Sequence, residues 1–246
     1  MNLVVCMKRV PDSAAKIRVA ADGKSIDKSG VDHVISPYDE IALERAIQIK
    51  EATDGATVTV VCFGPAEATK EIRQALAMGA DKAIHIKDSG ASRGPYGVAK
   101  LLAETLRGRE FDAVFCGRQS IDSDNSAVGI MIAQILGLPA VSLVTKLDIA
   151  DGKATAHREA EGGTEVIEVA LPAVFTAQRG LAEPRYPSIK GIMQAKKKPV
   201  EDVEASAPSG ALELNSLSPP PERQGGRIVG DAAELAQLLR QEAKVI

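Results

Sequence analysis

Tryptophan is absent from this 246-residue sequence, and aromatic residues make up only 3% of it, although 45% of the residues are hydrophobic. A chain of this length can bury a sizeable core, so alanine, valine, isoleucine and leucine must fill most of it. Cores of this composition are typical of parallel strands covered by helices. The net charge of −3 gives no broad basic face, and we therefore expect no nucleic-acid partner.

Cysteine is scarce, and long apolar stretches are lacking. Cys6, Cys62 and Cys116 each lie in a short strand-like run without a CxxC or metal-binding spacing, which indicates small buried hydrophobic residues in a reducing compartment. No apolar stretch reaches the ~20 residues that span a membrane. A strand-like run begins at Asn2, which leaves no room for a targeting peptide. We expect a cytoplasmic protein without direct membrane insertion.

Recognisable catalytic constellations are also lacking. The three histidines, His33, His85 and His157, are scattered, and the sequence has no GxSxG, HxxxH or HExxH spacing. We therefore expect no catalytic residues and no metal site, and an enzyme with unrecognised chemistry is the less favoured alternative.

Short apolar runs alternate with helix-like segments over the first 140 residues. The apolar runs predict strands at 2–8, 56–64, 82–86 and 111–117. Helical spacing and capping residues predict helices at 36–52, 66–78, 95–107 and 125–136. This alternation indicates an α/β fold with a doubly wound, mostly parallel sheet. Ligands of such sheets bind outside the carboxyl ends of the strands, near the switch in strand order.

The pattern changes in the second half of the chain. Three alternating runs between 141 and 171 are joined at Asp151-Gly152 and at Gly162-Gly163, which predicts an antiparallel meander that extends the sheet. Residues 173–178 are a candidate core strand, and 180–200 are a proline-punctuated surface segment. We expect an α/β domain of residues 1–199.

An extended C-terminal arm, residues 200–246, is expected to follow this domain. Residues 200–229 are too rich in proline, serine and glycine to pack a core. Asp231 and Glu234 begin a final helix whose apolar stripe consists of Leu235, Leu238 and Leu239. This helix could dock on its own domain, but a partner chain is favoured.

The loop GRQSIDSDNSAVG (117–129) joins a predicted strand to a predicted helix. Free backbone N–H groups and the helix dipole make such a helix start an anion site. We expect Ser126, Ala127 and Val128 in an uncharged first turn, Asp124 as its cap and Asp122 bonded to loop amides or a ribose hydroxyl. An ordinary capped helix without a ligand stays an open alternative.

Two other loops reach the same edge of the predicted sheet. ISPY (35–38) precedes a helix in which Ser36 is the expected N-cap, Pro37 the first residue and Asp39 the third, and FGPA (63–66) follows a strand. Taken singly, each is ordinary turn chemistry. Together with 117–129 they would enclose a nucleotide, which makes 1–199 a candidate nucleotide-binding domain.

Along nearly its whole length the chain resembles the β subunit of electron transfer flavoprotein. The matching stretches are KRVPDSAAKIRV (8–19), SPYDEIALERAI (36–47), FGPA with IRQALAMGADKAIHI (63–86), GRQSIDSDNSAVG (117–129) and LPAVFTAQRGLAEPRYPSIKGIMQAKKK (171–198). The resemblance implies an adenine nucleotide alpha hydrolase-like α/β fold and a heterodimer with an α subunit. It implies FAD mainly in the α subunit at the interface, and AMP as a structural ligand here, or a second FAD in electron-bifurcating relatives.

The resemblance also implies the partners. Electrons would come from acyl-CoA or other flavin dehydrogenases, as in fatty acid β-oxidation, and pass to a membrane quinone oxidoreductase. The implied nucleotide contacts are Cys6, Ser36, Pro37, Tyr38, Asp39, Phe63, Gly117, Arg118, Gln119, Ser120, Ile121, Asp122, Ser123, Asp124, Asn125, Ser126, Ala127 and Val128. The implied dehydrogenase-docking segment is Arg185, Tyr186, Pro187, Ser188, Ile189, Lys190, Gly191, Ile192, Met193 and Gln194, with Ile189 as its hydrophobic anchor.

Some positions depart from the family pattern. Ser13 stands where some members carry an aromatic residue near the flavin, and Ser36 where some carry asparagine. The loop reads DSDNSAVG, with Ser123 in place of a glycine and without a glutamine, which favours AMP over a second FAD. Lys196 to Lys198 could be a solvated charge run or a docking patch for an acidic partner. An adenine-nucleotide-binding regulator without redox work remains the alternative from another class.

Overall fold

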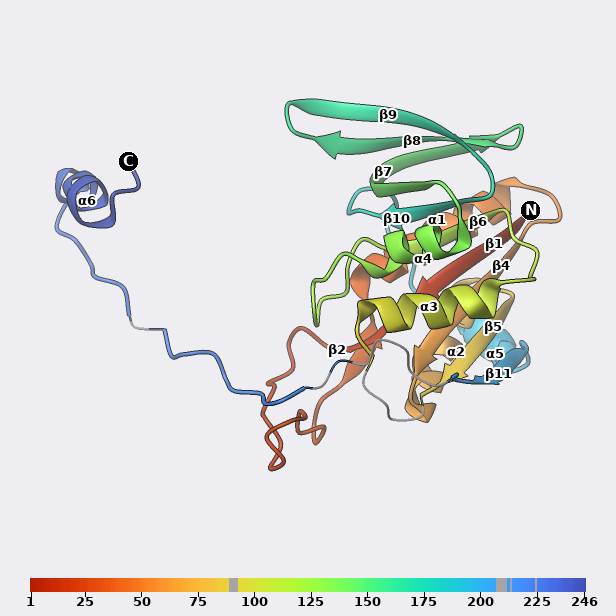
Figure 1. Ribbon diagram of the computed structural model, residues 1–246, viewed down its shortest axis with the longest axis horizontal. Helices are drawn as coiled ribbons and strands as arrows, with labels where there is room; N and C mark the ends of the chain where they lie inside the picture. The colour runs from red at the N-terminus through yellow and green to blue at the C-terminus, as the bar shows by residue number, and fades with distance from the viewer. Residues whose placement is uncertain (89–92, 207–211, 213, 224) are drawn as a thin grey trace.

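A nine-stranded sheet forms the centre of the computed structural model, which describes residues 1–88, 93–206, 212, 214–223 and 225–246 (Figure 1). The strand order is β11-β5-β4-β1-β6-β10-β7-β8-β9. The strands of this sheet are β1 (Asn2–Met7), β4 (Thr57–Gly64), β5 (Lys82–Lys87), β6 (Ala113–Gly117), β7 (Ala140–Ala150), β8 (Lys153–Ala160), β9 (Gly163–Ala170), β10 (Ala173–Ala177) and β11 (Val200–Glu204). Pairing is parallel from β11 to β7 and antiparallel from β7 to β9, which confirms the predicted fold class.

Helices cover both faces of the parallel part of the sheet. They are α1 (Pro37–Ala52), α2 (Thr69–Met78, after a 3₁₀ turn at Ala66–Ala68), α3 (Pro95–Leu106) and α4 (Val128–Leu136), whereas α5 (Ile189–Ala195) packs on α2. Side chains alternate across β1, so Leu3 and Val5 pack with α1 and α2, whereas Val4 and Cys6 pack with α3 and α4. The helices thus form the outer two layers of an α/β/α arrangement.

The chain leaves β1 and β6 in opposite directions across the sheet. After β1 it continues through α1 to β4 on one side, and after β6 it continues through α4 to β7 on the other. Since β1 and β6 are neighbours, their carboxyl ends form the switch point at which open α/β sheets bind ligands.

The antiparallel meander β7–β9 confirms the predicted extension of the sheet, at the top of Figure 1. The first turn is Asp151-Gly152 as expected, and both residues have positive φ. The second turn is Glu161-Gly162 rather than Gly162-Gly163, because Gly163 already pairs with Ala160 as the first residue of β9.

The C-terminal residues differ partly from expectation. Residues 200–229 were predicted to be too rich in proline, serine and glycine to pack a core, but the first five of them form β11, which pairs in parallel with β5. The final helix α6 (Ala232–Leu238) begins where predicted, with the Asp231 carboxylate accepting the N–H of Glu234 at 2.8 Å. A π-helical turn, Leu239–Ala243, follows. Figure 1 shows α6 lying well away from the sheet and its helices.

A small antiparallel pair, β2 (Arg9–Pro11) and β3 (His33–Ile35), lies beside the main sheet and leads the chain into α1.

Among the described residues, none of the helices has the length and apolar character needed to cross a membrane.

Close packing of α4 on the sheet requires a glycine in its first turn. A Cβ on Gly129 would lie 2.8 Å from Cγ2 of Thr176 and 3.2 Å from Cβ of Cys116. We therefore expect Gly129→Ala to lower the free energy of unfolding by ~1–3 kcal/mol, because α4 must move off the sheet. Urea unfolding followed by circular dichroism measures the change.

Gly163→Ala is the matched control. Its Cβ would meet no atom within 4 Å, so the unfolding free energy should stay within about 0.5 kcal/mol of the parent value. Equal losses for the two variants would contradict the packing assigned to Gly129.

Candidate functional site

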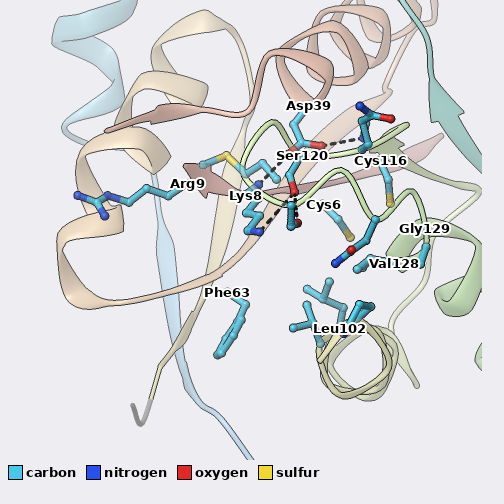
Figure 2. Close-up of a pocket in the computed structure, with 18 of the residues that line it drawn as sticks. Cys6, Lys8, Arg9, Asp39, Phe63, Leu102, Cys116, Ser120, Val128 and Gly129 are labelled. Carbon is cyan, nitrogen blue, oxygen red and sulfur yellow. Dashed lines mark hydrogen bonds between the residues drawn. The ribbon is translucent and has the colours of Figure 1, made fainter. Parts of the chain in front are cut away.

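A cavity of about 420 Å³ opens at the carboxyl ends of β1, β4 and β6 (Figure 2). The cationic residues Lys8, Arg9, Arg93 and Arg118 line part of its wall. Apolar groups line another part, namely Phe63, Pro95, Val98, Leu102 and Val128. Its volume falls in the range of small-molecule sites. A ligand with one anionic end and one flat apolar end fits such a lining.

The Asp39 carboxylate holds two of the strand ends that frame this cavity. Its Oδ2 accepts the backbone N–H of Lys8 at 2.8 Å, and its Oδ1 accepts the backbone N–H of Gly117 at 2.7 Å. These N–H groups belong to the residue that follows β1 and to the last residue of β6. Gly117 has to be a glycine here, because a Cβ would lie 2.6 Å from Oδ1 of Asp39 and 2.7 Å from Cβ of Tyr38.

Asp39 is an acid in an unusual environment. Burial is the largest influence on it and raises its pKa to about 7, against the opposing effect of the two backbone N–H donors, which favour the charged form. The carboxylate lies in the first turn of α1, where the helix dipole also favours negative charge. Its sequence position was predicted correctly as the third helical residue, but its role in tying two loops was not predicted.

The N-cap of α1 departs from expectation in one respect. Ser36 occupies the N-cap position and Pro37 is the first helical residue, as predicted. Within the described residues, however, the Ser36 hydroxyl makes no capping hydrogen bond, and Oγ is buried without a partner. The serine contributes through its main chain instead, because its N–H donates to the carbonyl of Lys8 at 2.9 Å.

The 117–129 loop is built differently from the predicted helix start. α4 begins at Val128 with Ala127 as N-cap, so Ser126 and Ala127 precede the helix rather than forming its first turn. Asp124 and Ser126 have φ values of 49° and 51°, in the left-handed region. The Asp124 carboxylate accepts from Nε2 of Gln119 at 2.6 Å instead of capping the helix. The first turn of α4 carries no acidic side chain, as expected.

Asp122 also differs from its predicted role. Its carboxylate pairs with Nζ of Lys8 at 2.6 Å, and Lys8 also donates to Oγ of Ser120 at 3.3 Å. Although partial burial raises it, the pKa of Asp122 is lowered on balance by the hydrogen bonds from Lys8 and Ser120. The pair ties the β6 loop to the end of β1 a second time.

The remaining cations of the lining have defined partners. Nε of Arg9 donates to the buried carboxylate of Glu71 on α2 at 3.1 Å. The guanidinium groups of Arg93 and Arg118 lie 5.5 Å and 5.6 Å from the ring centroids of Phe63 and Tyr38. Both are cation–π distances.

The structure brings most of the expected nucleotide contacts together and leaves some aside. Those that line the cavity are Cys6, Asp39, Phe63, Gly117, Arg118, Gln119, Ser120, Ser123, Asn125, Ser126, Ala127 and Val128. Those outside the lining are Ser36, Pro37, Tyr38, Ile121, Asp122 and Asp124.

Sequence reasoning missed part of the lining. The residues outside the predicted loops and contacts are Met7, Lys8, Arg9, Asp88, Arg93, Pro95, Val98, Leu102 and Cys116, whereas Gly64, Pro65 and Gly129 belong to the predicted loops 63–66 and 117–129. Lys8 could have been found, because it lies at the carboxyl end of a predicted strand. The α3 residues Val98 and Leu102 could not, because their approach to the cavity depends on how α3 packs on the sheet.

The expected docking segment, 185–194, lies on another part of the surface. The Arg185 guanidinium binds both Glu44 and Glu51 of α1, with closest N···O distances of 2.8 Å and 2.6 Å. From this anchor the chain enters α5, whose N-cap Ser188 accepts the N–H of Gly191 at 3.0 Å. Tyr186 is 96% and Ile189 81% exposed. Ile192 and Met193 are also exposed on α5.

The basic run after α5 is divided between structure and solvent. Nζ of Lys198 donates to the carbonyls of Leu76 and Ala80 at the end of α2, at 2.9 Å and 2.5 Å. Lys196 and Lys197 are exposed. The interpretation of all three lysines as one solvated or docking patch is therefore wrong for Lys198, which holds the segment on α2.

In the described part of the chain, His, Cys, Asp and Glu form no group of three that could hold a metal ion. The buried His85 contacts the carbonyl of Gly64 through Nε2 at 3.2 Å.

A pH dependence of stability follows from Asp39. Because its folded pKa is raised from 3.8 to about 7, the folded state holds this proton more tightly than the unfolded chain. Its contribution to the free energy of unfolding is therefore present below pH ~4 and lost as the pH rises towards 7, by an amount on the order of 2–4 kcal/mol. Asp39→Asn should remove this part of the slope, as measured by urea unfolding between pH 4.5 and 7.5.

Asp112→Asn serves as the control, because Asp112 accepts the N–H of Asn2 at the opposite end of β1. This variant should keep the slope of the parent protein. A parent slope unchanged in Asp39→Asn would contradict the raised pKa.

Comparison with known proteins places this chain in a family. A family model described as "Electron transfer flavoprotein domain" matches residues 24–208. The chain is 42% identical to the electron transfer flavoprotein subunit beta of Syntrophomonas wolfei over 250 residues, covering 100% of this chain and 98% of the relative. It is 42% identical to the Bacillus subtilis subunit over 260 residues and 36% to the Mus musculus subunit over 252 residues, covering at least 99% of each. The chain belongs to the electron transfer flavoprotein family, as a β subunit.

Proposed function

We propose that this chain holds AMP as a structural ligand in the cavity at the ends of β1, β4 and β6, within a heterodimer with the family's α subunit. The observation that carries the proposal is the lining itself, with cations on one part and apolar side chains on another. The phosphate would meet the cationic wall and the uncharged start of α4, where free N–H groups point outward. The adenine would lie against apolar side chains such as Phe63 and Leu102.

Two observations favour AMP over a second FAD. The cavity volume of about 420 Å³ lies near the lower end of the range for small-molecule sites, which suits a mononucleotide. Two of the lining cations are already neutralised, Lys8 by Asp122 and Arg9 by Glu71. The remaining positive charge matches one phosphate group better than a pyrophosphate. A second FAD, as in bifurcating relatives, is the alternative.

The α subunit would carry the redox FAD, which this chain helps to enclose. The arm supports a role in binding that partner, because the apolar stripe of α6 is left uncovered in the described chain, with Leu235 exposed. An amphipathic helix of this length is marginal by itself and is stabilised by packing on another surface. The C-terminal arm after β11 would thus bind the α subunit and hold the heterodimer together, whereas β11 itself belongs to the sheet.

The 185–194 segment would bind the electron donor, a flavin dehydrogenase such as an acyl-CoA dehydrogenase. The complex would then pass the electrons to a membrane quinone oxidoreductase. We expect this to occur in the cytoplasm of a prokaryote. Tyr186, Ile189 and Met193 give the segment exposed apolar side chains on a base fixed by Arg185. A small apolar anchor with a polar surround suits the brief contacts of redox partners. Electron transfer itself needs no catalytic side chain from this chain.

The nucleotide proposal is tested by mass spectrometry of the nucleotides released from the purified heterodimer. We expect one AMP and one FAD per heterodimer. Ala127→Glu should reduce AMP recovery by tenfold or more, because a carboxylate at the N-cap of α4 would repel the phosphate. Ala160→Glu, at the exposed end of β8, is the control and should retain AMP. Two FAD and no AMP would favour the bifurcating alternative, and a flavin-free homo-oligomer would favour the non-redox regulator.

The docking proposal is tested at Ile189. Ile189→Ala should slow flavin reduction by a dehydrogenase about tenfold, since a central apolar anchor contributes 1–2 kcal/mol. Flavin content should not change, because the side chain is 81% exposed. Stopped-flow absorbance measures the rate. Val166→Ala, which shortens an exposed side chain on β9, is the control and should reduce the flavin at the parent rate. Equal rates for the two variants would contradict the role of Ile189 as the anchor.

A further inference from the structure

Cys6 and Cys116 face the same cavity from two neighbouring strands. They are direct partners in the parallel pairing of β1 with β6, so their side chains lie on the same face of the sheet. Both pack in the cluster formed with α3 and α4, and both line the cavity. Figure 2 shows the two thiols pointing into the space in front of α4.

The backbone places this pair within disulfide range. Neighbouring strands lie about 4.8 Å apart, and disulfides join Cα atoms separated by about 4.4–6.8 Å. Cys6 is 6% and Cys116 5% exposed, and the exposed surface is on the cavity side. A hydrogen bond between the two cysteine side chains, together with burial, favours the protonated form of Cys116 and raises its pKa, which indicates that the two sulfurs interact.

The third cysteine offers a contrast within the same sheet. Cys62 pairs with Met7 on β1, one position out of step with Cys6, so it faces the α1 and α2 layer. It is fully buried, lies outside the cavity lining, and burial raises its pKa to about 12. An oxidant that enters the cavity reaches Cys6 and Cys116 but not Cys62.

We propose that Cys6 and Cys116 form a redox-responsive dithiol that closes to an intramolecular disulfide when a peroxide enters the cavity. One sulfur, that of Cys6, attacks a peroxide oxygen, the O–O bond breaks, and a sulfenic acid forms with release of water or an alcohol. The Cys116 sulfur then attacks the sulfenic sulfur, the S–S bond forms, the S–O bond breaks and water leaves. Two electrons pass from the thiols to the peroxide, and both thiol protons end in the released products.

The disulfide would act on the site that the cavity forms. Cys6 lies two residues before Lys8, and Cys116 directly precedes Gly117, the two residues that Asp39 holds. A covalent link at this level constrains both strand ends and, through them, the loops that follow. Conversely, a bound nucleotide covers the thiols and protects them, and this part of the inference rests on the proposed function.

The test is a peptide map of the full-length chain after exposure to hydrogen peroxide, with and without saturating AMP. Trypsin separates the three cysteines into peptides 1–8, 51–70 and 110–118. We expect peptide 1–8 to be joined to peptide 110–118, with a mass two hydrogen atoms below the sum of the two reduced peptides. Dithiothreitol should separate them again. AMP should slow this linkage at least tenfold. Cys62→Ala should leave it unchanged, whereas Cys6→Ala and Cys116→Ala should abolish it.

The state of the cysteine peptides after peroxide decides whether the proposal holds. Free thiols in peptides 1–8 and 110–118 after peroxide, or linkage of either to peptide 51–70, would overturn the proposal without needing any variant to fold. Calorimetry measures AMP binding separately. Linkage in a chain that binds no AMP would support the dithiol and refute the proposed nucleotide site. Bound AMP that leaves the linkage rate unchanged would overturn the claim that the occupant covers the thiols.

Discussion

The site depends on one buried carboxylate that accepts two backbone N–H groups. Asp39 joins the end of β1, at Lys8, to the end of β6, at Gly117, and it does so from the first turn of α1. Neighbouring parallel strands diverge into separate loops after their last ladder bond, so the space between these loops is not set by the sheet alone. The Asp39 carboxylate sets the distance between the two loops. Because burial disfavours the charged form of this carboxyl, its pKa is raised to about 7.

Several features of the site follow from that interaction. Gly117 must lack a Cβ because the carboxylate occupies the place where it would lie. Lys8, held by its main chain, can direct its side chain across the opening to Asp122. Cys6 and Cys116 lie side by side because the same two strands that Asp39 joins are in register there. The spacing of the two loops at the switch point is thus set by hydrogen bonds to the main chain of Lys8 and Gly117. Neighbouring side chains such as those of Cys6 and Cys116 are left to line the cavity.

The sequence predicted the sheet well and the loops less well, for a physical reason. β1, β4 and β6 are buried on both faces, so they appear as continuous apolar runs. β11 (VEDVE) is an edge strand rich in acids, and its partner β5 lies more than 100 residues earlier, so its composition resembled a linker. The left-handed conformations of Asp124 and Ser126 depend on hydrogen bonds to Gln119, which no local propensity encodes.

α1 contributes residues to both the cavity and the segment for which functions are proposed. Its first turn supplies Asp39 to the cavity, and its later turns supply Glu44 and Glu51 to Arg185 at the start of the docking segment. Glu44 and Glu51 are seven residues apart, two turns of helix, so they face the same guanidinium. The Arg185 guanidinium lowers the pKa of Glu51, and the two carboxylates raise that of Arg185, so the Arg185–Glu51 pair stays ionised at neutral pH, whereas the pKa of Asp39 is about 7. One helix therefore positions segment 185–194 through an ion pair with Arg185 and the cavity through a buried carboxylate whose pKa is about 7.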